Sequence, residues 1–144
     1  EENLNYSAAR LMEVWPSRFP TLQSAAPYAG NPQALANKVY GGRMGNTGPN
    51  DGWDYRGSGF LQLTGRSNWQ AAEKSLGIGL DTNPEMARVP ALSLLIALDF
   101  YTRNGVWAAL DAGDTAKARR ITNGGAIGLE NVNRLRAVAL AVLA

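Results

Sequence analysis

The sequence predicts one mainly helical (α+β) domain that contains a single small sheet. Its 144 residues, 45% of them hydrophobic, suffice for one globular core. Several segments space their apolar residues as helices do, between capping residues, whereas only residues 60–64 alternate with period two. Neither a repeat of roughly 20 to 50 residues nor a low-complexity linker divides the chain. We therefore expect residues 1–144 to form one domain.

Capping residues predict the helices of the first third of the chain. Ser7 is a suitable N-cap for a helix that ends before Pro16. A second helix begins after Asn31, with Pro32 in its first position, and stops at the following glycine pair. Residues 41–59 are rich in Gly, Asn, Asp and Pro and lack a helical period, so they predict a long functional loop, and its aromatic residues favour an ordered one.

The alternating stretch predicts the small sheet. Phe60, Gln62 and Thr64 would share one face of a strand, with Leu61 and Leu63 on the other, because side chains alternate along a strand. One face would belong to the core and the other would point outward. Further helices are predicted at residues 66–76, from Asn83, at 91–101, from Asp114 to the "NGG" at 123–125, and from Leu129 to Leu143. The total is about six helices.

Composition excludes several kinds of chemistry. The absence of cysteine and histidine rules out disulfides, thiolate zinc sites and histidine-dependent catalysis, so any catalysis uses carboxylates, hydroxyls, amides, Lys or Arg. The net charge is only +2 and the charges are scattered, so we expect no nucleic-acid arm and no membrane-surface patch. The apolar run at 91–101 is shorter than the about 20 residues a bilayer requires and predicts a buried helix. "EENLNYSAAR" is not a signal peptide.

A polar set near the predicted strand is the first candidate site. Gln62 and Thr64 would point the same way, and Asn68 follows one turn later. Neutral hydrogen-bonding groups suit the hydroxyl and N-acetyl groups of a sugar polymer, and Trp53 and Tyr55 could cover apolar ring faces. The pattern alone favours a plainer alternative, a solvated hairpin face with Asn68 capping the next helix.

Other candidate residues are each ambiguous. Asn123 in "TNGG" could place an amide at a ligand or simply end a helix, and Arg134 or Arg136 could pair with a carboxylate or lie on a solvated face. A glycosidase needs two carboxyl groups, about 5 Å apart for retention or roughly 6.5 to 9.5 Å apart for inversion. Asp51 and Asp54 fit this need best by local chemistry, although a turn-forming role is favoured for both.

Five segments together resemble, in order and spacing, the family 19 glycoside hydrolases, and in particular their small bacterial and phage chitinase-like endolysins. The segments are "NLNYSA", "YRGSGFLQLTGRSNW", "NPEMARVPALSLLIALDFY", "ITNGG" and "NRLR". The resemblance covers nearly the whole chain, and residues 55–69 are its most specific part. It implies a lysozyme-like, bilobal helical domain with a small β-hairpin at the cleft, and an inverting mechanism.

The resemblance also assigns roles to residues. Glu2 matches the general base that activates the attacking water, and Thr64 matches the hydroxyl residue that helps to hold this water. Gln62 and Asn68 match sugar-binding amides. Asn123 matches the Asn of the family's "NGG", and Arg134 matches an Arg that organises the catalytic carboxylates. Substrate contacts are therefore expected at Tyr55, Gln62, Asn68, Asn123 and Arg134.

Two departures from the family pattern bear on activity. The family's general acid lies in a His-Glu-Ser/Thr motif upstream of the segment that starts this chain, so we expect that the chain lacks this acid and an N-terminal helical portion. A general acid contributes about 10²- to 10⁴-fold in rate, so the chain alone would be nearly inactive. The second departure is Ser58, which stands where the family usually has Arg.

The expected function is inverting hydrolysis of β-1,4 glycosidic bonds in a polymer that contains N-acetylglucosamine, more probable for peptidoglycan than for chitin. The small, cysteine-free, slightly basic chain favours peptidoglycan. The alternatives are a chitinase and, from another class, a non-catalytic wall-binding module or inactive fragment. We expect a monomer that acts at the cell wall, in the periplasm or outside the cell, with a polysaccharide as partner and without cofactor, metal, nucleic acid or membrane.

Overall fold

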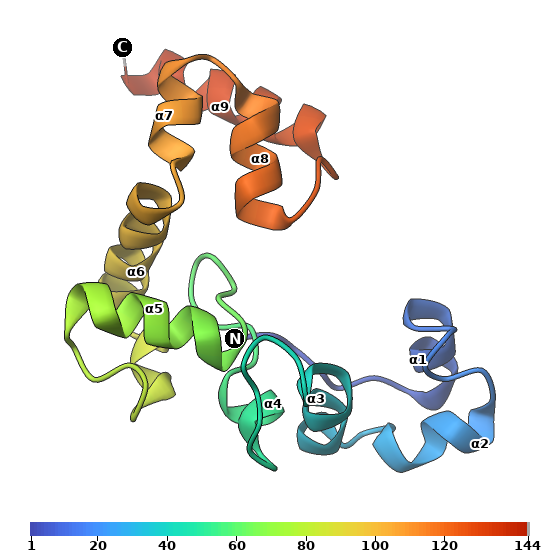
Figure 1. Ribbon diagram of the computed structural model, residues 1–144. Helices are drawn as coiled ribbons and strands as arrows, with labels where there is room; N and C mark the ends of the chain where they lie inside the picture. The colour runs from blue at the N-terminus through green and yellow to red at the C-terminus, as the bar shows by residue number, and fades with distance from the viewer. Residues whose placement is uncertain (144) are drawn as a thin grey trace. The chain divides into compact units, whose positions relative to one another are not determined.

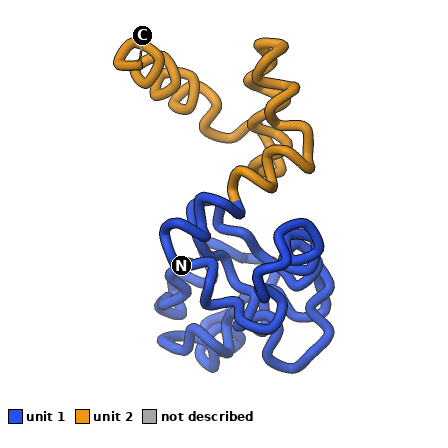
Figure 2. The backbone as a smooth tube through the Cα atoms, turned by 90° about the vertical axis from the view of Figure 1, so that its left-hand side faces the viewer, with its two compact units in different colours: residues 1–96 blue, residues 97–144 orange. Residues whose placement is uncertain are grey.

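The computed structural model describes residues 1–143, and these are mainly helical (Figure 1). Within that range the only β structure is one antiparallel bridge, between Ser58 and Leu63. The chain divides into two compact units, residues 1–96 and residues 97–144 (Figure 2). The predicted mainly helical class is confirmed, with the expected hairpin reduced to a single bridge.

The first unit contains short helices joined by well-defined turns. They are α1 (Ala8–Val14), α2 (Leu22–Ala25), the 3₁₀ helix η1 (Ala26–Tyr28), α3 (Pro32–Tyr40), α4 (Asp51–Asp54), α5 (Arg66–Leu76) and the 3₁₀ helix η2 (Pro84–Arg88). Two of them begin where the sequence predicts, since Ser7 Oγ accepts from the backbone N–H of Arg10 and Asn31 Oδ1 accepts from that of Ala34. The α5 helix ends at Gly77, which has the left-handed conformation typical of a helix end.

The core of the first unit fixes the segment that precedes α1. This core consists of Leu4, Leu11, Phe19, Ala25, Leu35, Ala36 and Val39. Leu4 lies outside any helix and is 1% exposed, so its burial holds the extended residues around it against α1 and α3. Glu2, two residues before Leu4, is held next to Gly57 because its backbone N–H donates to Gly57 O at 2.7 Å.

The predicted strand at residues 60–64 does not form. Gly59, with φ of +73°, reverses the chain at once, and Gln62 has a φ of +53°, which no strand residue adopts. Residues 59–62 are therefore a tight turn that is closed by the Ser58–Leu63 bridge and by the Gln62 N–H, which donates to Gly59 O. The turn leaves Phe60 at its tip, 66% exposed.

The long loop at residues 41–59 is ordered, as expected, but it is not free of helix. The α4 helix forms one turn inside it, and the buried side chain of Asp51 at the start of that turn accepts from the backbone N–H groups of Thr47 and Gly48. These bonds tie the first part of the loop to α4.

Four helices lie wholly or partly in the second unit, and α6 (Pro90–Arg103) begins in the first. They are α6, α7 (Val106–Asp111), α8 (Thr115–Asn123) and α9 (Leu129–Leu143). Asp114 caps α8 as predicted, since its Oδ1 accepts from the backbone N–H of Lys117 at 2.8 Å. The small core of this unit is formed by Val106, Ala109 and Ala118.

The helix predicted at 91–101 forms as part of α6, but the prediction that it is buried is wrong. Only Ser93 and Ile96 of α6 are buried, whereas Leu94, Leu95 and Leu98 are 40 to 50% exposed. The helix carries apolar residues on all sides, and the described residues cover one side only. Among residues 1–143, no helix combines the length and the apolar character that crossing a membrane requires.

Candidate active site in the first unit

The carboxylate of Glu2 is held by a tyrosine hydroxyl. Tyr40 Oη, at the end of α3, donates toward both carboxylate oxygens, at 2.7 Å from Oε1 and 2.9 Å from Oε2. Burial and this hydrogen bond to Glu2 raise the pKa of Tyr40, so the phenol stays protonated and keeps its role as donor. Backbone and side chain of Glu2 are thus both fixed.

Sequence reasoning did not identify Tyr40 as a site residue. It is the last residue of the helix in "NPQALANKVYGG", where a tyrosine is an ordinary helix-end residue. Its partner lies 38 positions away in the chain, so only the fold brings them together. The one local signal was a tyrosine directly before the predicted functional loop at residues 41–59.

The side chains of Glu2 and Gln62 both lie close to Gly57, on the side where another residue would have its Cβ atom. A Cβ atom built on this glycine would lie 3.0 Å from Gln62 Oε1 and 3.2 Å from Glu2 Oε2. Both side chains therefore occupy the space that any other residue at position 57 would fill. The structure brings these two predicted site residues together.

Gln62, Thr64 and Asn68 form a connected polar group. Thr64 Oγ1 donates to the carbonyl oxygen of Gln62 at 2.9 Å, and Asn68 Nδ2 donates to that of Thr64 at 2.8 Å. The Gln62 and Asn68 side chains are exposed, and among residues 1–143 no hydrogen bond is formed to Gln62 Oε1 or Asn68 Oδ1. Two side-chain acceptors thus remain open to a ligand. Asn68 lies in the first turn of α5 and does not cap it, since the cap is Gly65.

Tyr55 has a packing role in this structure. Its side chain is 4% exposed, its hydroxyl donates to Asp81 O at 2.9 Å, and its ring packs edge-on against Trp69. The buried ring offers no open face, and contact of Tyr55 with a sugar stays a prediction.

Glu1 is an ion-paired neighbour of Glu2. Its Oε2 lies 2.5 Å from Arg56 Nη2 and 2.7 Å from Arg88 Nη2. Burial alone would raise the pKa of Glu1, but the hydrogen bond from Arg56 and the charges of both arginines outweigh it and lower that pKa. Glu1 is therefore a carboxylate and a poor proton donor. Arg56 is itself fixed over the ring of Trp53, with its Cζ 3.6 Å from the ring centroid.

Glu2 is one of the residues that line a surface pocket of about 220 Å³. The pocket is lined by Glu1, Glu2, Asn3, Leu4, Pro32 and Trp53. A pocket lined by both acidic and aromatic residues is a suitable arrangement for a sugar ring, which has polar edges and an apolar face. This pocket, with the Gln62 group, is the candidate active site.

Asp51 and Asp54 do not form an acid–base pair. Asp51 is buried and accepts two hydrogen bonds from Arg66, at 2.5 and 2.9 Å, besides those from Thr47 and Gly48. The hydrogen bonds of Arg66 and then those of the loop amides lower the pKa of Asp51 to about 2. The turn-forming role favoured by the sequence is confirmed for Asp51, and Asp54 is exposed to solvent.

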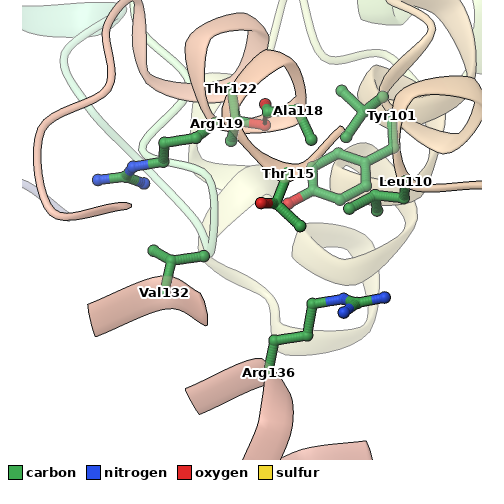
Figure 3. Close-up of a pocket in the computed structure, with 9 residues that line it drawn as sticks. Tyr101, Leu110, Thr115, Ala118, Arg119, Thr122, Val132 and Arg136 are labelled. Atoms are coloured by element: carbon green, nitrogen blue, oxygen red, sulfur yellow. Dashed lines mark hydrogen bonds between the residues drawn. The ribbon is translucent and has the colours of Figure 1, made fainter. Parts of the chain in front are cut away.

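The remaining predicted residues lie in the second unit. Asn123 is the last residue of α8, and Arg134 on α9 donates to Asn131 Oδ1 at 2.9 Å. Arg136 lines a pocket of about 100 Å³ together with Tyr101, Thr115 and Arg119 (Figure 3). The roles of Asn123 and Arg134 in binding and catalysis stay predictions.

The structure holds no candidate metal centre in residues 1–143, where no three potential ligands among His, Cys, Asp and Glu cluster together. The polar groups of the site are carboxylate, hydroxyl and amide groups.

Comparison with known proteins indicates what the chain resembles. A glycosyl hydrolase family 19 domain-containing protein of Haemophilus influenzae is 34% identical over 137 residues, which are 90% of this chain and 64% of that protein. This similarity supports glycoside hydrolase family 19 as the family of the chain. Two Arabidopsis thaliana endochitinases are 42% and 39% identical over 74 residues, which are 51% of the chain and 26% of each plant protein. The chain matches no family model.

The family 19 relatives are longer than this chain. The chain spans less than two thirds of the Haemophilus protein and about a quarter of each plant endochitinase. The similarity therefore supports the family and leaves the activity of the whole protein to be proposed from the site.

Proposed function

We propose that the protein is a family 19 glycoside hydrolase that cleaves β-1,4 bonds in an N-acetylglucosamine-containing wall polymer, with peptidoglycan as the favoured substrate. The observation that carries this proposal is Glu2, whose carboxylate is held by the Tyr40 hydroxyl and which lines a pocket together with Trp53. The side chain of Gln62, which belongs to the turn at 59–62, lies near the Glu2 carboxylate beside Gly57.

In the proposed inverting reaction, Glu2 is the general base. It takes a proton from a water molecule whose oxygen attacks the anomeric carbon, while the general acid protonates the leaving glycosidic oxygen. Thr64 would help to hold the water, and Gln62 and Asn68 would bind the sugar. Glu1 does not act as the acid, because Arg56 and Arg88 hold it ionised. We assign the acid to the His-Glu-Ser/Thr motif that the family resemblance places upstream of Glu1.

Peptidoglycan and chitin are the two candidate substrates, and each is favoured by a different observation. The cysteine-free sequence with a net charge of +2 favours peptidoglycan, an anionic wall polymer. The similarity to two plant proteins named endochitinases favours chitin as the second candidate. Both polymers present N-acetylated sugar rings, so the same pocket would serve for either.

The test compares the full-length protein with its Glu2→Gln variant on both polymers. Turbidity loss of outer-membrane-permeabilised Gram-negative cells measures peptidoglycan hydrolysis, and release of soluble oligosaccharides measures chitin hydrolysis. We expect Glu2→Gln to abolish hydrolysis and to keep polymer binding, because the amide retains the size of the carboxylate but not its basicity. Glu13→Gln, on the exposed side of α1, is the matched control and should retain full activity.

Each outcome has a distinct meaning. Chitin cleavage without cell lysis would identify a chitinase, and polymer binding without any product would identify a wall-binding module. Hydrolysis by Glu2→Gln at the rate of the parent protein would show that Glu2 is not the base.

A further inference from the structure

A second pocket adjoins the candidate active site. It has a volume of about 310 Å³ and is lined by Glu1, Gly59, Phe60, Arg88, Pro90 and Ser93. Glu1 also lines the pocket beside Glu2, so the two pockets are neighbours on the surface of the first unit. None of the predicted site residues lines this second pocket.

Phe60 offers an aromatic face to this pocket from a rigid position. Its backbone N–H donates to Ser93 Oγ at 2.7 Å, and Ser93 is buried in α6. The turn packs closely against Ser93 and Ala87. A Cβ atom built on Gly59 would lie only 2.6 Å from Ser93 Oγ and 2.8 Å from Ala87 O. The ring is nevertheless 66% exposed. An exposed aromatic side chain on a backbone that is already fixed can bind a ligand without the entropic cost of ordering the turn.

The polar part of the pocket carries no net charge. Arg88 lies at 2.7 Å from Glu1, and it also pairs with Glu85. The guanidinium is therefore compensated, so the pocket does not favour a strongly anionic ligand. It still offers donors from Arg88 and an acceptor from Glu1, both partly exposed. Such groups match the hydroxyl and amide groups of a neutral sugar.

We propose that this pocket, the Phe60 pocket, is an additional saccharide-binding subsite that takes a neutral, N-acetylated sugar ring. The ring would place its apolar face on Phe60 and its polar edge on the Glu1–Arg88 pair. This inference rests on the proposed function, since the bound ring belongs to the same polymer chain that passes Glu2. Because Glu1 is common to both pockets, one chain occupies them together.

The test measures how affinity depends on oligosaccharide length. The full-length Glu2→Gln protein, which leaves the sugar intact, is titrated calorimetrically with di-N-acetylchitobiose and hexa-N-acetylchitohexaose. Adding Phe60→Ala should weaken binding of the hexasaccharide roughly three- to tenfold and change binding of the disaccharide much less. Phe60→Tyr, which keeps the ring, should bind as the parent does.

Leu22→Ala is the matched control, because Leu22 is a 60% exposed apolar residue of the first unit that lines neither pocket. It should leave both affinities unchanged. Unchanged hexasaccharide affinity in Phe60→Ala, or an equal loss for both lengths, would overturn the additional subsite. If the parent binds only peptidoglycan, muropeptides of one and three disaccharide units replace the two chitin oligosaccharides.

Failure of the proposed function gives a different result. In that case the unsubstituted protein releases no product from peptidoglycan or chitin, and the hydrolysis assay shows this whatever residue stands at position 60. A Glu2→Gln parent that binds neither oligosaccharide nor insoluble peptidoglycan rejects the Phe60 pocket as well. A parent that binds, combined with a Phe60→Ala variant that binds equally well, rejects the Phe60 pocket alone.

Discussion

Replacing Asp51 by Asn should destabilise the first unit by an amount that depends on pH. The Asp51 carboxylate is 3% exposed, pairs with Arg66 through two hydrogen bonds and ties the residues before α4 to this helix. The asparagine keeps the shape of the side chain but removes its charge. It leaves the guanidinium of Arg66 with a neutral acceptor in place of a carboxylate.

The size of the pH-dependent part follows from the pKa of Asp51. Arg66 and the loop amides lower it from 3.8 to about 2 in the folded protein. A lowered carboxyl pKa stabilises the folded state above the unfolded value, and this contribution is lost as the pH falls through the folded value. The shift corresponds to about 2 kcal/mol of unfolding free energy, most of it lost between about pH 5 and pH 2.

Urea unfolding followed by circular dichroism at pH 5 and at pH 2 measures this contribution. The parent protein should exceed Asp51→Asn in unfolding free energy at pH 5, and the difference should shrink by about 2 kcal/mol at pH 2. Asp54→Asn, an exposed carboxylate of the same helix, should show no comparable change between the two pH values. A difference between parent and Asp51→Asn that is the same at both pH values would refute the role assigned to the Arg66 pair.

Two further substitutions test the geometry around Glu2. Tyr40→Phe should lower kcat about tenfold with little change in KM, because it removes a hydrogen bond to the charged carboxylate of Glu2. Steady-state kinetics measures both constants, with Tyr28→Phe as the control. An unchanged kcat in Tyr40→Phe would argue that the hydroxyl does not position Glu2. Gly57→Ala should reduce activity but barely alter the thermal midpoint, since its Cβ would press on the side chains of Gln62 and Glu2 rather than on backbone. Full activity in this variant would show that the approach of these two side chains is unimportant.

Helix ends were the most predictable part of this fold, because capping is local chemistry. Ser7, Asn31 and Asp114 each accept a hydrogen bond from a backbone N–H three residues later, and these caps follow from residue type and spacing alone. The bounds of α9, Leu129–Leu143, were likewise correct from its apolar spacing. The interactions that define these elements lie within one turn of chain.

Other features depended on interactions that no local pattern contains. The alternation at residues 60–64 predicted a strand, but Gly59 and its contact with Ser93 turn the chain back after one bridge. The partnership of Tyr40 with Glu2 depends on how α3 packs against an extended segment far away in sequence. Gln62 was identified in advance as a site residue, whereas the glycine that makes room for it was not.

The candidate base lies on an extended segment and not on a helix or strand. Its position therefore depends on a few separate anchors, namely burial of Leu4, the Glu2–Gly57 backbone hydrogen bond and the two arginine pairs of Glu1. Local opening of residues 1–4 would remove the carboxylate from its site while every helix stays intact. Activity should then be lost at a lower temperature or denaturant concentration than the helical circular dichroism signal. Inactivation and unfolding would be two separate transitions.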